Sequence, residues 1–355
     1  MTVSVRAFAK INLGLRIGAL RKDEFHELLT VYQTIAMHDI VRVSVERGGG
    51  IEIRCADPGV PRDESNTCYR IVEKALRALQ AKGRVAVEIE KKLPVQGGLG
   101  GASSNAVAAL LGLERALKKA LPTAERLKIA EEVGSDLPLF LVGGTVLGVG
   151  RGEQVYPLED LPATPCVVAT PDVGVSTPKA FAEWDRLCGA GLCGAGAPAR
   201  EDAALTGTAG PGFAEESARR HTGKLTVHDA SARINELGRG LSAWLSERYS
   251  GAPHGSRRFR RGRAENPLLA LVRTGIENDF EQVVFPEYPE LSEARRALER
   301  AGAKYASLSG SGSALYGLFT STDAAGTAAR TLRKQGWAAQ ATTTLTRRQY
   351  WKRFF

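Results

Sequence analysis

Several common signatures are missing from this 355-residue chain. It contains no Gly-Lys-Ser or Gly-Lys-Thr, so a nucleotide-binding loop of the Walker A type is excluded. No apolar run approaches the ~20 residues that a membrane-spanning helix requires. The first residues, Met1 to Val5, lack the basic and apolar regions of a secretory signal peptide. These absences predict a cytoplasmic protein without a membrane anchor.

Cysteine is scarce, and no internal repeat is evident. The five cysteines are odd in number and their spacing does not fit a zinc site. We therefore expect reduced, structural thiols, because no neighbouring residue would activate a catalytic one. Charged residues make up 25% of the chain, which is typical of a globular protein. The length favours two domains.

Positive charge is in excess, with a formal net charge of +9. Most of the excess falls within residues 186–263, which hold 13 Lys and Arg against 7 Asp and Glu. The arginine-rich tract at 256–263 is expected to be a solvated loop, and contact with nucleic acid is the alternative. Because the basicity is confined to one segment, nucleic acid is not the expected main partner.

The most informative segment runs from Pro94 to Leu110. Four glycines within five positions are followed by two serines and an apolar run that predicts a helix over about 103–119. Glycine permits a positive φ and the close approach of a ligand. The start of a helix offers free N–H groups and the positive end of its dipole. The segment predicts a phosphate-binding loop, with a tight packing turn as the alternative.

Polar residues in three other places are candidates for a site. Lys10 and Asn12 lie two apart on a predicted strand, so both face either solvent or a shared site. Phe25 and His26 sit in a polar turn, which is either a ligand contact or plain surface. Asp136 precedes an apolar segment at 137–142, where it either caps a helix or acts as a catalytic carboxylate. A second glycine–serine turn lies at 306–314.

The remaining pattern predicts a mixture of helices and strands. Strand 40–46 is expected to pair with 51–54 through Gly48–Gly50. Strands 145–149 and 155–158 should close a first domain, and strand 166–169 should open a second. Further helices are predicted at 66–82, 123–133, 228–249, 289–301 and 322–336, with strands at 85–89, 315–319 and 338–345.

Three of these segments together resemble the three motifs of the GHMP kinases, which lack a Walker A loop. They are the Lys10–Asn12 strand, the 94–105 loop and the 307–314 turn. Within that superfamily, the segments 9–13, 25–28, 93–105, 134–138 and 278–281 are similar to the 4-diphosphocytidyl-2-C-methyl-D-erythritol kinase family. The resemblance covers residues 1–185 and 265–355.

The resemblance implies an α+β protein of two GHMP kinase domains with the active site in the cleft between them. The domains would be 1–160, which binds ATP, and 161–355, with an atypical, flexible insertion at about 186–264. The implied reaction is phosphorylation of the 2-hydroxyl of the CDP-linked methylerythritol in the non-mevalonate isoprenoid pathway. ATP with Mg²⁺ would be the donor, although no protein ligand of the metal is predicted. A monomer or weak homodimer is expected.

The resemblance also implies roles for individual residues. Asp136 would accept the proton of the attacking hydroxyl, and Lys10 would lie beside it, keep it ionised and stabilise the transferred phosphate. The implied ATP-binding residues are Pro94, Gly97, Gly98, Leu99, Gly100, Gly101, Ala102, Ser103, Ser104, Asn66 and Lys91. The implied substrate-binding residues are Asn12, Phe25, His26, Thr177 and Phe181, with the cytosine between the rings of Phe25 and Phe181.

The sequence departs from the family pattern in a few places. Phe25 stands where the family usually has tyrosine, so stacking survives but a hydroxyl is lost. Gln96 and Ala102 occupy positions that are often small or glycine, and Ala102 requires a negative φ. The alternative is a GHMP kinase for another small alcohol, such as homoserine or mevalonate. The Phe25–His26 pair argues against that alternative, since such an enzyme needs no base-binding pocket.

Overall fold

The computed structural model describes residues 2–95, 97–188, 267–272 and 276–355, and positions 234–235, 237–239 and 241–242. The described positions between 234 and 242 are helical, in agreement with the predicted helix 228–249. The expectations for Gln96, for the arginine-rich tract at 256–263 and for most of the 186–264 insertion lie outside the described residues.

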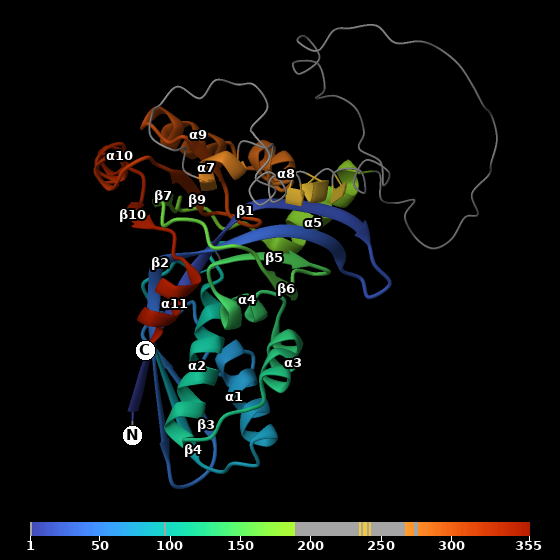
Figure 1. The fold of residues 1–355 in the computed structure, drawn as a ribbon, viewed down its shortest axis with the longest axis vertical. Helices are drawn as coiled ribbons and strands as arrows, with labels where there is room; N and C mark the ends of the chain where they lie inside the picture. Colours follow the sequence, from blue (N-terminus) through green and yellow to red (C-terminus); the bar gives the residue numbers. More distant parts are fainter. Residues whose placement is uncertain are drawn as a thin grey trace, which may run out of the picture.

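A six-stranded sheet forms the first half of the structure (Figure 1). Its strands are β1 (Thr2–Leu20), β2 (His26–Glu46), β3 (Ile51–Cys55), β4 (Arg84–Glu90), β5 (Thr145–Val149) and β6 (Gln154–Pro157). The order is β3-β4-β2-β5-β6, and β1 pairs with β2. The helices of this half are α1 (Thr67–Ala78), α2 (Gly101–Leu117), α3 (Thr123–Val133) and α4 (Leu137–Val142). Val5, Val43 and Val87 share one core with Val107 of α2.

The predicted pairing of strand 40–46 with 51–54 is wrong. β3 does not pair with β2; it pairs with β4 in parallel, and β4 lies between them. The reason is the crossover through α1, which returns the chain so that β4, with Val85, Val87 and Ile89 buried, takes the position next to β2. β2 is also longer than predicted. It is buried on both faces over 29–35, so the alternation typical of a half-buried strand begins only after residue 35.

A four-stranded sheet with the order β10-β7-β9-β8 forms the second half. Its strands are β7 (Pro165–Ala169), β8 (Tyr305–Leu308), β9 (Leu315–Leu318) and β10 (Ala339–Thr343). The helices are α5 (Thr177–Leu187), α7 (Pro267–Val272), α8 (Glu281–Glu287), α9 (Pro289–Arg300) and α10 (Thr322–Lys334). The last helix, α11 (Arg347–Phe354), instead joins the core of the first half. A domain boundary near residue 160 stays a prediction.

The two sheets share apolar contacts. Ile11 and Leu13 of β1 pack in one buried cluster with Val168 of β7 and Leu318 of β9. The hydroxyl of Tyr316 on β9 donates to the main-chain oxygen of Asn12 at 2.9 Å. The strand that carries Lys10 and Asn12 is therefore fixed by both halves of the molecule. No helix in the described part of the chain is both long and apolar enough to span a membrane.

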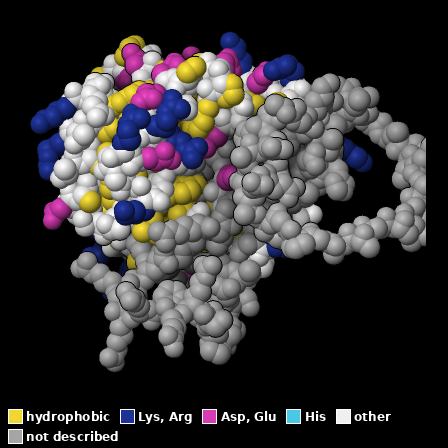
Figure 2. Space-filling view, turned by 90° about the horizontal axis from the view of Figure 1, so that it is seen from above, with side chains coloured by type: hydrophobic (Ala, Val, Ile, Leu, Met, Phe, Trp, Pro, Cys, Tyr) yellow, Lys and Arg dark blue, Asp and Glu magenta, His cyan; other side chains and the backbone are white. Residues whose placement is uncertain are grey.

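Charge is mixed on the face seen from above in Figure 2, where Lys and Arg side chains lie beside Asp and Glu. Ion pairs also link opposite charges along α9, where Arg295 lies 3.3 Å from Glu299 and Arg296 lies 3.1 Å from Glu293. A nucleic-acid surface gathers positive charge on one face. The tract at 256–263, on which the nucleic-acid alternative depends, lies outside the described residues, so that alternative stays untested.

Candidate active site

The glycine loop opens α2 directly. The helix begins at Gly101, two residues before the predicted start, and its N-cap is Gly100 with φ 70°. Gly98 also has a positive φ, 71°. A Cβ atom on Gly98 would lie 2.0 Å from the main-chain oxygen of Ser309, so only glycine fits. Ala102 lies within the helix and is absent from the positive-φ residues, so alanine is accommodated at this position.

A pocket of about 380 Å³ lies on this loop. Of the predicted ATP-binding residues, its lining includes Pro94, Gly97, Gly98, Leu99, Gly100, Gly101, Ala102, Ser103, Asn66 and Lys91. Ser104 does not line it. The Ser104 hydroxyl is buried and has no hydrogen-bond partner among the described residues, and the side-chain oxygen of Asn105, in the pocket wall, is equally unpartnered.

Asn66 and Lys91 are already bound to other protein groups. The Asn66 side chain caps α1 by accepting from the Cys68 N–H at 2.8 Å, and it donates to the Pro61 oxygen at 2.6 Å. The Lys91 ammonium lies 2.6 Å from the buried carboxylate of Asp39. Both residues therefore shape the pocket wall, and Lys91 brings a charge that Asp39 neutralises.

Lys10 and Asp136 lie together at the end of this loop. Lys10 Nζ is 3.5 Å from Asp136 Oδ2 and donates to Asn12 Oδ1 at 2.7 Å. Lys10 is almost fully buried, whereas the Asp136 side chain is 32% exposed and so accessible to a ligand. The Lys10 main-chain N–H donates to the Leu99 oxygen, which joins the pair to the glycine loop. Asp136 precedes α4, but its side chain makes no capping hydrogen bond, so the cap alternative is wrong.

Asn12 is placed beside Lys10, on the shared face that the two-residue spacing predicts. Its amide nitrogen donates to Thr30 Oγ1 at 2.8 Å, so both polar atoms of the side chain are engaged. The arrangement holds the Lys10 ammonium in place. A contact of Asn12 with the cytidine end of a substrate stays a prediction.

Tyr32 belongs to this site and was missed by the sequence analysis. Its hydroxyl donates to Asp136 Oδ1 at 3.0 Å. Burial, followed by the negative charge of Asp136, raises the pKa of Tyr32 well above its usual value, so it remains a hydrogen-bond donor. No local signal marks Tyr32, because it lies in the doubly buried part of β2, 104 residues before Asp136.

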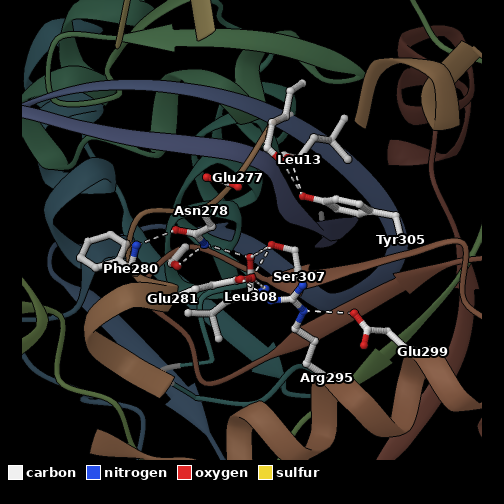
Figure 3. A network of polar contacts seen from close by, with 12 residues as sticks. Leu13, Glu277, Asn278, Phe280, Glu281, Arg295, Glu299, Tyr305, Ser307 and Leu308 are labelled. Atoms are coloured by element: carbon white, nitrogen blue, oxygen red, sulfur yellow. Dashed lines mark hydrogen bonds and ion pairs between the residues drawn. The ribbon is translucent and has the colours of Figure 1, made fainter. Parts of the chain in front are cut away.

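The second glycine–serine turn is held from behind by a polar network (Figure 3). The Glu281 carboxylate accepts from the Ser307 hydroxyl at 2.7 Å and from the Leu308 N–H at 2.8 Å. Its other oxygen accepts from Arg295 at 2.9 Å. The Asn278 amide donates to the main-chain oxygens of Leu308 and residue 310, at 2.9 and 2.8 Å. The 278–281 segment therefore fixes the shape of this turn.

The second turn also contacts the glycine loop. The Ser309 hydroxyl donates to the Gly98 oxygen at 3.0 Å, and the Ala314 N–H donates to the Gly97 oxygen at 3.1 Å. Thr177, at the start of α5, shares a hydrogen bond of 2.7 Å with the Ser311 hydroxyl. The three segments that carry the motifs thus meet at one place, as the resemblance implies.

The predicted base-binding residues form a separate group. The His26 ring stacks on Phe181 with centroids 5.0 Å apart and planes at 11°, and His26 Nε2 lies 2.7 Å from Asp185 Oδ1. Phe25 is 49% exposed, with the Arg151 guanidinium 4.8 Å from its ring centroid. His26 therefore covers one face of Phe181. A base could stack between Phe25 and Phe181 only on the other face or after His26 moves.

Three cysteines of the described residues lie in the protein interior. Cys55, Cys68 and Cys166 form no disulfide, as predicted, and all three are buried. Burial raises the pKa of Cys68 and of Cys166 to about 12, which keeps both protonated.

Comparison with known proteins identifies the architecture. Residues 66–144 match the family described as GHMP kinases N terminal domain, and residues 263–337 match GHMP kinases C terminal. Two solved structures share the fold. A homoserine kinase from Cytophaga hutchinsonii aligns with a TM-score of 0.65 and 19% identity, covering 97% of this chain and 95% of that chain. A mevalonate kinase aligns with a TM-score of 0.61 and 11% identity, covering 98% of this chain and 99% of that chain. At these identities they support the fold alone.

Sequence relatives are more specific. The 4-diphosphocytidyl-2-C-methyl-D-erythritol kinase of Solibacter usitatus is 34% identical over 90% of this chain and 82% of that protein. The enzyme of the same name from Acaryochloris marina is 33% identical over 89% and 86%. A crystal structure of 4-(cytidine 5'-diphospho)-2C-methyl-D-erythritol kinase aligns with a TM-score of 0.64 and 27% identity, covering 96% of this chain and 99% of that one. These matches confirm the resemblance and the α+β fold. The chain belongs to the 4-diphosphocytidyl-2-C-methyl-D-erythritol kinase family of the GHMP kinases.

Proposed function

We propose that this chain transfers the γ-phosphoryl group of ATP to the 2-hydroxyl of 4-diphosphocytidyl-2-C-methyl-D-erythritol, in the non-mevalonate route to isoprenoids. The observation that carries this proposal is the Lys10–Asp136 pair, 3.5 Å apart and bonded to the glycine loop through the Lys10 N–H. The name shared by the sequence relatives supports the choice of acceptor.

Asp136 acts as the general base. Tyr32 holds one carboxylate oxygen, and the partly exposed side chain leaves room for a substrate hydroxyl at the carboxylate. As that hydroxyl oxygen attacks the γ-phosphorus, its proton passes to Asp136. The new O–P bond forms, the bond between the γ-phosphorus and the β,γ-bridging oxygen breaks, and ADP leaves with that electron pair.

Lys10 and the loop stabilise charge. The Lys10 ammonium is held by Asn12 and Asp136, so it is already oriented when negative charge develops on the transferred group. The first residues of α2 line the pocket, and the N–H groups at this helix start would bind the donor phosphates.

Magnesium would accompany ATP in this arrangement and would offset the negative charge of its phosphates. Among the described residues, no group of three or more His, Cys, Asp and Glu could hold a metal ion by itself. Mg²⁺ usually keeps several waters and takes only one or two protein oxygens. The Asp136 carboxylate, which is partly exposed, would be an oxygen of that kind.

The acceptor's base is assigned to the group around His26. Phe25 and Phe181 offer aromatic faces, and His26 with Thr177 offers polar contacts. A cytoplasmic location and a monomer or weak homodimer remain part of the same proposal.

Removal of either member of the pair tests the catalytic roles. We expect Lys10→Ala and Asp136→Asn each to lower kcat by about 10²–10⁴-fold, because they remove a charge donor and a base. Steady-state rates of ADP formation with Mg-ATP would measure this, together with the melting temperature. The matched controls Lys128→Ala and Asp172→Asn change residues outside the site and should keep the wild-type rate. Full activity in Asp136→Asn would refute its role as base.

A substrate panel tests the choice of acceptor. The purified protein should phosphorylate the CDP-linked alcohol and ignore homoserine and mevalonate. Phosphorylation of homoserine or mevalonate alone would replace this proposal by the alternative.

A further inference from the structure

The C-terminal segment connects the second sheet with α4, the helix of the first half that follows Asp136. β10 belongs to the second sheet, whereas Leu345, Tyr350 and Phe354 are buried in the core of the first half. The connection is fixed by the Gln33 side chain, which donates to the Leu345 oxygen at 2.8 Å. Figure 1 shows α11 in red close to α4, and two hydrogen bonds join these helices.

α11 binds the last turn of α4. The Tyr350 hydroxyl donates to the Phe140 oxygen at 2.7 Å, and Trp351 Nε1 donates to the Val142 oxygen at 3.0 Å. The last carbonyl oxygens of a helix have no hydrogen-bond donor within the helix. These two bonds provide donors for two such oxygens of the six-residue α4. A Cβ atom on Gly143, which has φ 71°, would lie 2.4 Å from the Tyr350 ring, so the ring is packed tightly against the end of α4.

The other end of α4 is the active site. Asp136 immediately precedes the helix, and its carboxylate is bound by Tyr32 and Lys10. The Phe140 ring also supports the glycine loop, since a Cβ atom on Gly100 would lie 2.9 Å from its tip. A shift of α4 along its axis would therefore move the base and the loop together.

We propose that Tyr350 is a positioning residue for phosphoryl transfer: through its bond to the Phe140 oxygen, α11 fixes α4 and with it the distance of Asp136 from Lys10 and the loop. This inference rests on the proposed function of Asp136. Tyr350 is fully buried, and burial raises the pKa of its hydroxyl well above the usual value, so it donates throughout the working pH range.

The variant Tyr350→Phe tests this, because it keeps the ring and removes only the hydroxyl. We expect kcat per folded molecule to fall about tenfold with both KM values within twofold of wild type, since the substrates still bind while the base is misplaced. Hydrogen exchange should rise about tenfold or more in the peptide covering 137–143 and stay unchanged in β7 and β9. Tyr156→Phe is the control, because Tyr156 is exposed and its hydroxyl makes no hydrogen bond among the described residues.

Two outcomes would overturn the inference. Unchanged exchange over 137–143 would show that the hydroxyl does not hold α4. A lower melting temperature with unchanged kcat per folded molecule would show that α11 contributes stability only. A wild-type protein without kinase activity would instead refute the proposed function, and the exchange experiment would still decide whether Tyr350 holds α4.

Discussion

The two glycine–serine segments of this chain are alike in composition and differ in what surrounds them. The first, residues 97–103, opens α2 and forms part of the wall of a pocket. The second, residues 307–313, is buried throughout and lies between two paired strands, β8 and β9. Its polar groups are bound by Asn278 and Glu281.

The difference comes from the element at the C-terminal end of each segment, a helix for the first and a strand for the second. A helix leaves its first N–H groups without partners, so a ligand can take them. In a turn between antiparallel strands, the flanking backbone groups already bond to each other in the ladder. Here the half-buried Glu281 carboxylate also accepts the Leu308 N–H. We infer that the first segment binds the phosphate donor and the second segment positions it, through the bond from Ser309 to Gly98.

The largest effect should follow from closing the space between the two segments. In Gly98→Ala the new methyl group would lie 2.0 Å from the Ser309 oxygen, and the residue would also have to adopt φ 71°. Overpacking and the left-handed conformation together should lower the free energy of unfolding by about 2–4 kcal/mol, and kcat/KM for ATP should fall roughly a hundredfold because the loop is displaced. Urea denaturation and steady-state kinetics would measure both.

Gly326→Ala provides the control for that variant. Gly326 lies inside α10, where a Cβ atom meets only the end of Arg330, so alanine should stabilise the protein by roughly 0.5–1 kcal/mol without changing the kinetics. A Gly98→Ala protein with wild-type stability and ATP affinity would contradict the close contact between the two segments.

The sequence predicted the loop because its signals are local. Glycines, serines and the apolar period of α2 lie within seventeen residues, and Lys10 and Asn12 share a face by strand geometry alone. The partners that complete the site are distant in sequence. Tyr32 reaches Asp136, and Tyr350 reaches Phe140 across 210 residues. Such pairs depend on tertiary packing, as does the insertion of β4 between β2 and β3, so no single-sequence pattern indicates them.

A smaller, pH-dependent effect should follow from Glu281, the carboxylate behind the second segment. Burial raises the pKa of Glu281 above 4.5 in the folded protein, against the partial compensation of Arg295. Its raised pKa stabilises the folded state at pH values below 4.5, and this contribution is lost as the pH rises through the folded-state value. Glu281→Gln cannot titrate and does not lose this contribution. Its free energy of unfolding, measured relative to wild type, should therefore increase as the pH rises over the same interval.

Urea denaturation between about pH 4 and pH 8 would show this, and parallel curves for the two proteins would contradict it. Glu281→Ala serves as the comparison variant. It cannot titrate either, but it also removes the acceptor for the Ser307 hydroxyl and the Leu308 N–H, so it should be about 1–3 kcal/mol less stable than Glu281→Gln at every pH.

The smallest effect is the one that tests the link itself. Ser309→Ala removes the hydrogen bond to the Gly98 oxygen and leaves both segments otherwise intact, so the free energy of unfolding should fall by only about 0.5–1.5 kcal/mol. Because Gly98 belongs to the donor loop, KM for ATP should rise severalfold while KM for the acceptor stays near the wild-type value. Ser313→Ala is the control, because Ser313 lies in the same turn and its hydroxyl makes no hydrogen bond among the described residues. It should change neither the free energy of unfolding nor KM for ATP as Ser309→Ala does. Equal changes in both KM values would mean that the second segment contacts the acceptor as well. They would contradict the inference that the second segment acts only by positioning the donor-binding segment.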